Sequence, residues 1–128
     1  RIEPGKRMLS SMSPTLVLKN REPYLIVGSP GGSRIITTVA QTILNVVRFG
    51  QGIEQAVAQP RVHHQWLPDV LYLEQGKFDI NTVQSLIRHG HAVEERAPFG
   101  EVQAILINGA GLMTGASDPR GRGSAGGF

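Results

Sequence analysis

Two short segments near the start of the chain combine small residues and hydroxyl groups in a way that suits anion binding. One is Leu9–Thr15 (LSSMSPT), and the other is Gly28–Arg34 (GSPGGSR). The apolar run Tyr24–Val27 leads into the second segment, and an amphipathic helical pattern follows it. A strand, a glycine loop and a helix start together collect backbone N–H groups around an anion. The sequence therefore predicts a pocket for negative charge, carried by a ligand or by a transition state.

Gly31 and Gly32 are the residues of the second segment best suited to hold such an anion. They have no side chain to block a ligand, they adopt positive φ readily, and a helix dipole lies behind them. The loop could act as an oxyanion hole or as a phosphate cradle. Neither G-x-x-x-x-G-K-S/T nor G-x-G-x-x-G is present. An ordinary tight turn explains the same spacing equally well.

Ser10 and Ser11, together with Ser13, are the candidates in the first segment. Hydroxyl and N–H groups of a proline-bounded turn could hold a carboxylate. A solvated turn, in which the serines cap the local backbone, is the more frequent use of such residues.

The histidines are interpreted as structural. His63 and His64 are neighbours in an expected strand and point to opposite faces, so they cannot easily share one metal ion. The chain has no cysteine, and no carboxylate stands at ligand spacing, so no metal site is expected. We interpret His63 and His64 as structural residues beside Trp66, and His89 and His91 as structural residues at a helix end.

Two further charged features have alternative interpretations. Arg34 follows the glycine loop and could bind an anion or pair with a carboxylate that supports the loop. Asp118–Arg120 predicts a turn with its own salt bridge, or a brace for a neighbouring site. No serine or threonine lies convincingly beside a base, and no carboxylate pair has acid/base spacing. We therefore expect no complete catalytic site within these residues.

Composition indicates a folded domain or a part of one. The chain has 128 residues, of which 40% are hydrophobic and 18% charged. The net charge is only +3, the basic residues are scattered and 5% of residues are aromatic, so no nucleic-acid surface is expected. No apolar stretch approaches the ~20 residues of a membrane span. The start, Arg1–Pro4, lacks Met and a signal peptide, which suggests a processed product or a piece of a longer protein.

Local patterns predict a mainly antiparallel sheet with packed helices, an α+β fold. Strands are expected at Thr15–Lys19, Tyr24–Gly28, Arg61–Gln65, Val70–Glu74, Ala92–Arg96, Val102–Ile107 and Leu112–Ala116. Helices are expected at Ile35–Val47, Gly52–Ala58 and Asn81–His89.

The connections between these elements also carry signals. Asn20–Pro23 predicts a longer hairpin loop, and Asn108-Gly109 predicts a tight hairpin turn. Ser33 is a plausible N-cap for the first helix. The tail Pro119–Phe128 is glycine-rich and expected to be irregular.

Four segments in chain order resemble the signatures of the γ-glutamyltransferase family. They are Pro4–Thr15, similar to the segment leading into the active site; Gly28–Ile35, similar to the oxyanion loop; Pro60–Asp69, similar to a third signature; and Gly115–Arg120, similar to the closing motif. The resemblance covers Pro4–Phe128, and four motifs in the same order make it specific.

The resemblance implies an N-terminal-nucleophile hydrolase with an αββα sandwich. In this family a precursor cuts itself into a large and a small subunit. The new N-terminal threonine of the small subunit is the nucleophile, and its α-amine is the base. It attacks the γ-glutamyl amide of glutathione, and water or an acceptor amino acid then releases the glutamyl group from the acyl-enzyme. Residues 1–128 would be the C-terminal part of the small subunit.

The resemblance also implies roles for particular residues. Gly31 and Gly32 would donate N–H groups to the oxyanion, Ser10 and Ser11 would bind the α-carboxylate of the glutamyl group, and His63 and His64 would be structural. The reaction needs no cofactor. The nucleophilic threonine and the residues that bind the substrate α-amine would lie upstream of Arg1, and the large subunit would supply an arginine. The chain alone is therefore expected to be inactive, and export to the periplasm or medium is implied.

Other functions remain open at this point. Related enzymes hydrolyse glutaryl side chains of β-lactams or transfer poly-γ-glutamate, and a non-catalytic module could use residues 28–33 to hold an anion. Exposed sheet edges invite pairing with another chain. Because Tyr24–Val27 and Val102–Ile107 are apolar, a dimer or higher oligomer of the piece is expected.

Overall fold

Two β-sheets organise the chain. A computed structural model describes residues 1–127, so Phe128, the end of the predicted irregular tail, lies outside the described residues. The larger sheet is antiparallel, with the strand order β1-β2-β6-β7. Its strands are β1 (Thr15–Lys19), β2 (Glu22–Gly28), β6 (Gln103–Ile107) and β7 (Met113–Ser117). The smaller sheet contains β3 (Val62–His63), β4 (Leu71–Glu74) and β5 (Val93–Arg96), with β4 and β5 parallel.

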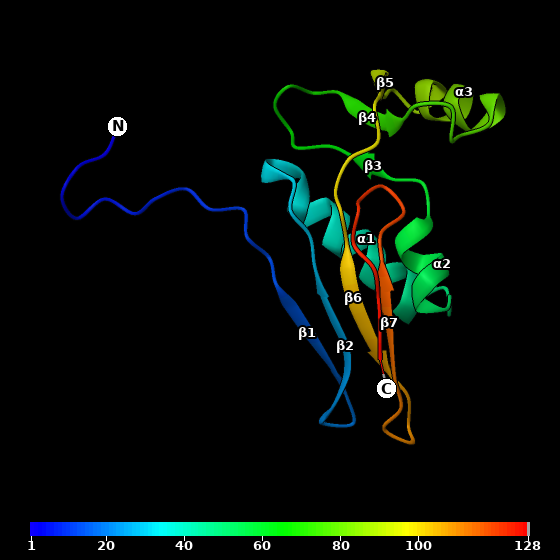
Figure 1. Ribbon diagram of the computed structural model, residues 1–128. Helices are drawn as coiled ribbons and strands as arrows, with labels where there is room; N and C mark the ends of the chain where they lie inside the picture. The colour runs from blue at the N-terminus through cyan, green and yellow to red at the C-terminus, as the bar shows by residue number, and fades with distance from the viewer. Residues whose placement is uncertain (128) are drawn as a thin grey trace.

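The helices lie on one side of the larger sheet and beside the smaller one. They are α1 (Ile35–Val47), α2 (Ile53–Ala58) and α3 (Ile80–Arg88), and a short 3-10 turn, η1 (Gly32–Arg34), precedes α1. Figure 1 shows α1 and α2 against the larger sheet and α3 near the smaller sheet. The predicted α+β fold, with a mainly antiparallel sheet and packed helices, is confirmed. In the described residues no helix is long and apolar enough to cross a membrane.

The core lies between the larger sheet and the two helices. Side chains alternate along β2: Leu25 and Val27 are buried, whereas Ile26 is 42% exposed. This alternation follows the period of two of a strand, so one face turns to the helices. Helix α1 contributes Val39 and Val46 to the same cluster. The buried face of β2 therefore packs against α1.

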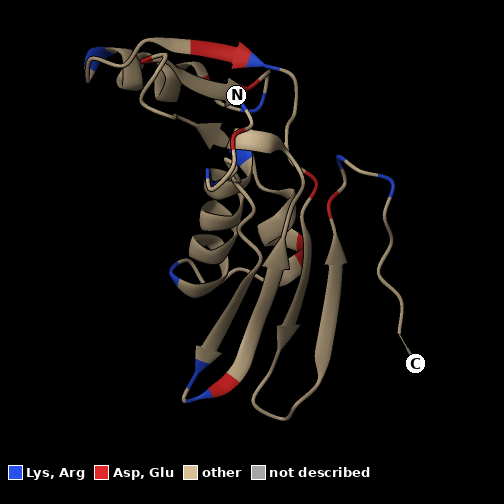
Figure 2. Ribbon diagram, turned by 90° about the vertical axis from the view of Figure 1, so that its left-hand side faces the viewer, with Lys and Arg blue, Asp and Glu red and all other residues tan. Residues whose placement is uncertain are grey.

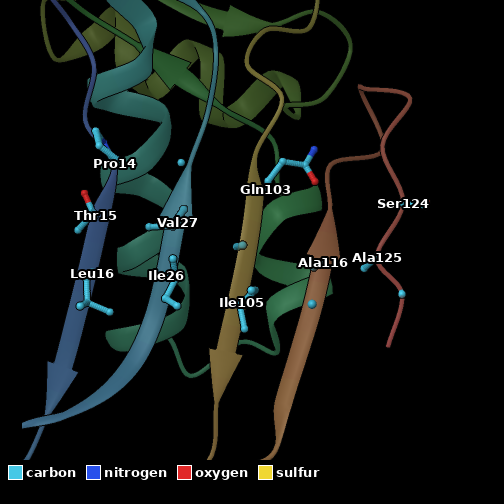
Figure 3. A pocket seen from close by; sticks show the side chains of 14 residues that line it. Pro14, Thr15, Leu16, Ile26, Val27, Gln103, Ile105, Ala116, Ser124 and Ala125 are labelled. Atoms are coloured by element: carbon cyan, nitrogen blue, oxygen red, sulfur yellow. The ribbon is translucent and has the colours of Figure 1, made fainter. Parts of the chain in front are cut away.

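The opposite face of the larger sheet is open and apolar. Leu16, Ile26 and Ile105 point to this side, and the tail around Ala125 runs along it (Figure 3). Charged residues gather at the ends of the strands and on the smaller sheet (Figure 2). A groove on this face has no ionisable side chain among its described lining residues, so it does not provide acid/base chemistry. The expected oligomer of the piece stays a prediction.

The two hairpins are the reverse of what the sequence pattern predicted. β1 and β2 are joined by a tight turn, because Lys19 pairs with Glu22 and both Asn20 and Arg21 have positive φ. This is the backbone of a type I′ turn, which matches the twist of the strands. The predicted longer loop, Asn20–Pro23, is therefore wrong.

The second hairpin has the longer loop. Ile107 pairs with Met113, so the connection is residues 108–112 rather than a tight Asn108-Gly109 turn. The Asn108 side chain accepts hydrogen bonds from the amides of Ala110 and Leu112 at 2.9 and 3.0 Å. An asparagine side chain that accepts hydrogen bonds from the following amides stabilises a wider loop. Here these bonds prevail over the tight turn that Asn-Gly favours.

Ser33 is not the N-cap of α1, contrary to the prediction. The N-cap is Arg34, and Ser33 lies one residue earlier in η1. Gly31 and Gly32, at φ 141° and 59°, bend the chain into the 3-10 turn before the α-helix begins. The Ser33 hydroxyl is free to donate elsewhere, to Gln65 Oε1 at 2.9 Å. The predicted strand Arg61–Gln65 is likewise shorter, with only Val62–His63 paired.

Candidate functional site

The glycine turn, residues 28–34, lies where β2 leaves the larger sheet. Gly31 and Gly32 both have positive φ, the region that glycine enters without steric cost. Among residues 1–127, neither amide donates a hydrogen bond to another protein group. Gly31 caps η1 and Gly32 is its first residue, so both N–H groups lie at the start of η1, and the first amides of α1 add to the local positive potential. The turn can therefore bind an oxyanion or a similar group.

One side of the glycine turn is held by the loop that leads into β6. The Glu101 amide donates to Ser29 Oγ at 3.0 Å, and this hydroxyl donates to the Pro30 carbonyl at 2.7 Å. Gly100 packs against Gly31: a Cβ placed on Gly31 would lie 3.8 Å from the Gly100 Cα. The turn is thus tied to a strand that is adjacent to β2 in the sheet.

Gly100 must itself be a glycine. Its φ is +77°, and a Cβ there would lie 2.9 Å from Thr38 Cγ2 and 3.1 Å from Arg61 Nη1. Such distances require the neighbours to move, and both neighbours are buried. The close approach lets the loop pass between α1 and the Arg61 guanidinium.

Arg34 lies over an aromatic ring. Its guanidinium carbon is 5.2 Å from the centre of the Phe99 ring, a cation–π contact that adds to the clamp on the turn. No carboxylate pairs with Arg34 in the part of the chain that the structure describes. The predicted role as a partner of a supporting carboxylate is not found, and direct anion binding stays a prediction.

A buried cluster of four charged residues lies behind the glycine turn. The ion cluster consists of Arg61, Glu74, Asp118 and Arg120. Arg61 pairs with Asp118, whereas Arg120 contacts Glu74 Oε2 at 2.5 Å and Asp118 Oδ1 at 3.0 Å. The turn Asp118–Arg120 therefore has its own salt bridge, as the sequence predicted.

The ion cluster also joins parts of the chain that are distant in sequence. Arg61 donates to the carbonyls of Phe99 and Val57, both at 2.8 Å. Asp118 accepts from the Val102 amide at 2.9 Å, at the start of β6. The cluster thus connects the end of α2, the loop before β6 and the segment after β7, and it braces the backbone behind Gly100.

Hydrogen bonds, rather than burial, decide the protonation of Asp118. Burial alone would raise its pKa, but the amides of Val102 and Arg120 and the guanidiniums of Arg61 and Arg120 outweigh this, so the pKa lies below its ordinary value. Burial lowers the pKa of Arg61, which Asp118 partly offsets. For Arg120, the bonds to Glu74 and Asp118 overcome burial and raise the pKa.

Ser10 and Ser11 precede β1 in a segment that runs away from the sheet (Figure 1). Ser10 is exposed and its Oγ accepts from the Met12 amide at 3.3 Å; Ser11 is half-buried. Thr15 pairs with Val27, so this segment enters the sheet at the end where β2 leads into the glycine turn. Within residues 1–127 no hydrogen bond joins either serine to that turn. The structure thus brings the two segments to one end of the sheet without a described hydrogen bond between these serines and the glycine turn.

The adjacent histidines have different surroundings. His63 is 2% exposed and packs on Tyr72 and Phe99, not on Trp66 as expected. His64 is more exposed and contacts Asp69 at 3.0 Å, and its Nδ1 accepts from the Trp66 amide. In the described part of the chain, no group of three or more His, Cys, Asp or Glu residues is placed to hold a metal ion.

His89 and His91, the two histidines at the end of α3, make different hydrogen bonds. His89 caps α3, and its Nδ1 lies 2.7 Å from the Ser85 carbonyl. For His91, the backbone amide donates to Leu86 O at 3.2 Å. Both lie at the end of α3, so the predicted structural role at a helix end agrees with these contacts.

Several residues near the glycine turn were missed from the sequence: Arg61, Gln65, Glu74 and Phe99. Glu74 ends the strand pattern of β4, and a carboxylate there carries no local sign of burial. The available signal is that Arg61 and Gln65 fall inside Pro60–Asp69, the segment that resembles a third family signature, but the resemblance implied no role for either residue.

Comparisons with known proteins agree on one family. A family model described as gamma-glutamyltranspeptidase matches residues 1–128. The glutathione hydrolase proenzyme of Escherichia coli (strain K12) is 47% identical over 119 residues, which are 93% of this chain and 20% of that protein. The chain thus spans about a fifth of the length of such curated relatives. The crystal structure of the T380A mutant of Helicobacter pylori γ-glutamyltranspeptidase is 46% identical, with a TM-score of 0.89, over 94% of this chain and 66% of that one.

Proposed function

Because the chain belongs to the γ-glutamyltranspeptidase family, we propose that it is the C-terminal part of a γ-glutamyltransferase small subunit. Its α+β fold is that of an N-terminal-nucleophile hydrolase. The complete enzyme would cleave the γ-glutamyl amide of glutathione and transfer the glutamyl group to water or to an amino acid. The nucleophilic threonine and the large subunit would be partners outside residues 1–128, and export to the periplasm or medium is part of the proposal.

The observation that carries the proposal is the pair of unengaged amides in the glycine turn. When the threonine hydroxyl attacks the γ-carbonyl, its oxygen becomes negatively charged. The N–H groups of Gly31 and Gly32 would donate to that oxygen. Donors held in place before the reaction need no reorganisation and stabilise the transition state most. The clamp by Ser29 and Glu101 provides such rigidity on one side.

The chemistry proceeds in two balanced steps. In the first, the threonine oxygen bonds to the carbonyl carbon of the γ-glutamyl amide, the amide C–N bond breaks, and the hydroxyl proton passes to the leaving amine by way of the threonine α-amine. In the second, water or an acceptor amine attacks the ester carbonyl carbon and gives a proton to the threonine α-amine. The C–O bond to threonine breaks, and this proton passes to the threonine oxygen. Gly31 and Gly32 would bind the oxyanion in both steps.

Ser10 and Ser11 would bind the α-carboxylate of the glutamyl group. Ser10 Oγ already accepts from Met12 N, so its own proton is available to a ligand. The segment joins the sheet beside Val27, near the glycine turn, which supports the assignment. Chain or partner segments outside residues 1–128 would complete this side of the pocket.

The whole proposal is tested by reconstitution. Residues 1–128 alone are expected to release no product from glutathione or from a chromogenic γ-glutamyl amide. The same chain, together with its upstream segment and large subunit, is expected to hydrolyse both. Activity of the isolated chain would place the nucleophile within it and contradict the proposed mechanism. Hydrolysis of a glutaryl amide but not of glutathione by the complete enzyme would instead favour a related acylase.

Ser10→Ala and Ser11→Ala are each expected to raise KM for the γ-glutamyl amide about 10- to 100-fold in the complete enzyme. A hydrogen bond to a charged group contributes about 1.5–3 kcal/mol, and about 1.4 kcal/mol corresponds to a factor of ten. The matched control is a substrate that lacks the α-carboxylate. For this substrate the variants and the native enzyme should have the same KM. Equal increases with both substrates would contradict carboxylate binding.

A further inference from the structure

His63 is a buried imidazole with a fixed ring. It lies in β3 and is 2% exposed. Its ring stacks on Tyr72 at 6.3 Å between centres and meets Phe99 edge-on at 6.2 Å. These contacts define the ring plane and therefore the directions of both ring nitrogens.

One nitrogen reaches the glycine turn through an amide. His63 Nε2 lies 3.0 Å from Gln65 Oε1, which also accepts from the Ser33 hydroxyl at 2.9 Å. Gln65 Nε2 donates to the Leu67 carbonyl at 2.9 Å, which sets the amide so that its oxygen faces His63. Because an amide oxygen only accepts, His63 Nε2 carries a proton.

The other nitrogen reaches α1, the helix that follows the turn. His63 Nδ1 lies 2.7 Å from Thr37 Oγ1. Because the ring proton is on Nε2, Nδ1 accepts from this hydroxyl, whose single proton is then not available to the Arg34 carbonyl. Through its two nitrogens the ring is therefore linked to Ser33 of η1, which directly follows Gly32, and to Thr37 of α1.

Strand β3, which carries His63, is held to α1 by hydrogen bonds. Gln41 donates to the Val62 carbonyl at 2.7 Å and accepts from the Val62 amide at 2.9 Å. The same side chain donates to the Thr37 carbonyl at 2.8 Å. β3 thus cannot shift along α1 without breaking these bonds, and the ring next to Val62 is positioned with it.

We infer that His63 is a positioning residue, which holds η1 through Gln65 and Ser33 (the His63 relay), is itself fixed to α1 through Thr37, and so aims the amides of Gly31 and Gly32. The inference rests on the proposed function of these amides. Packing alone would be satisfied by the aromatic contacts and does not require a polar link to the turn. An oxyanion hole benefits from such a link, because small displacements of its donors reduce the rate strongly.

Ser33→Ala tests the link nearest to the glycine turn. Ser33 is exposed, so its hydroxyl can be removed with little loss of packing. In the complete enzyme we expect kcat to fall about tenfold, with KM changed less than about twofold, because the lost interaction acts in the transition state. The matched control is Ser85→Ala on α3, a half-buried serine away from the turn, which should leave both constants unchanged.

Two variants of His63 separate the polar links from packing. His63→Gln places an amide nitrogen near the Nε2 position and should retain the bond to Gln65, whereas His63→Leu retains neither link. We expect kcat in the order native, His63→Gln, His63→Leu. Ser33→Ala should add little to the defect of His63→Leu, since the two residues belong to one relay. If His63→Leu fails to fold, Ser33→Ala still decides.

The proposed function and the positioning role of His63 are contradicted by different results. If the native complete enzyme hydrolyses the γ-glutamyl amide but Ser33→Ala matches Ser85→Ala, the role of His63 is overturned and the proposed function stands. If the native enzyme is inactive, the proposed function is contradicted. Hydrogen exchange in residues 29–36 then decides the relay. The Arg34 and Ile35 amides, which bond Gly31 O and Gly32 O, should exchange faster in Ser33→Ala. Unchanged exchange would overturn the relay.

Discussion

Asp118→Asn is expected to lower the free energy of unfolding by about 3–5 kcal/mol at pH 7, the range for breaking a buried ion pair by removing one partner. The side chain of Asp118 is fully buried and faces two guanidiniums and the Val102 amide. Asparagine keeps the shape but removes the charge, and its NH2 group would face other donors. Arg61 would then lack its carboxylate while remaining buried.

Urea unfolding followed by circular dichroism measures this change. Asp69→Asn is the matched control, because Asp69 also pairs with a base, His64, but its side chain is 88% exposed. An exposed pair contributes about 0–1 kcal/mol, so the control should resemble the native protein. Equal effects of the two substitutions would show that the ion cluster does not hold the fold together.

The same carboxylate gives stability a defined dependence on pH. The pKa of Asp118 is lower in the folded state than its ordinary value, because its hydrogen bonds outweigh the effect of burial. Its contribution is therefore complete above the unfolded pKa of about 3.9 and is lost as pH falls through the lower folded value. The stability difference between the native protein and Asp118→Asn should be larger at pH 7 than in strong acid.

Gly32→Pro is expected to lower kcat of the complete enzyme about 10²- to 10³-fold, the cost of removing one oxyanion-hole donor. Proline has no N–H group and its φ is locked near −65°, whereas Gly32 has φ +59°. The substitution therefore removes both the N–H donor and the positive φ of residue 32. KM should change far less, since the α-carboxylate contacts lie in a different segment.

Two further substitutions separate donor loss from backbone damage. Gly32→Ala keeps the N–H group but costs about 1–2 kcal/mol in the left-handed region, so its activity should lie between the native protein and Gly32→Pro. Gly76→Pro imposes the same strain at φ +65° in the turn after β4, and it should leave kcat unchanged. A Gly32→Pro enzyme with native kcat would refute the oxyanion role of this amide.

Much of the fold was predicted from local patterns. The apolar spacing of Ile35–Val47 and the alternation around Leu25 and Val27 are properties of neighbouring residues, and both elements formed as expected. The hairpins were less predictable. The turns at Asn20-Arg21 and at residues 108–112 depend on register and on side-chain bonds from Asn108, which a short motif does not encode.

The candidate site, too, was predicted only in part from the sequence. Gly31, Gly32, Ser10 and Ser11 were identified because glycine spacing and hydroxyl runs are visible in the sequence, and four ordered motifs identified the family, which the comparisons confirm. Their roles stay predictions. The interpretation of His63 as structural beside Trp66 overlooked its links to Ser33 and Thr37, because the first passes through Gln65 and Thr37 lies 26 residues away.

The sequence by itself therefore determined most of the elements, the family and the position of the glycine turn, since backbone preferences act over a few residues. Only the tertiary structure decided what holds that turn. The ion cluster joins Arg61, Glu74 and Asp118 from separate segments, and the His63 relay joins β3 to η1. The physical reason is that burial and hydrogen bonding of these side chains depend on which distant segments meet, and this is settled only when the sheets and helices pack.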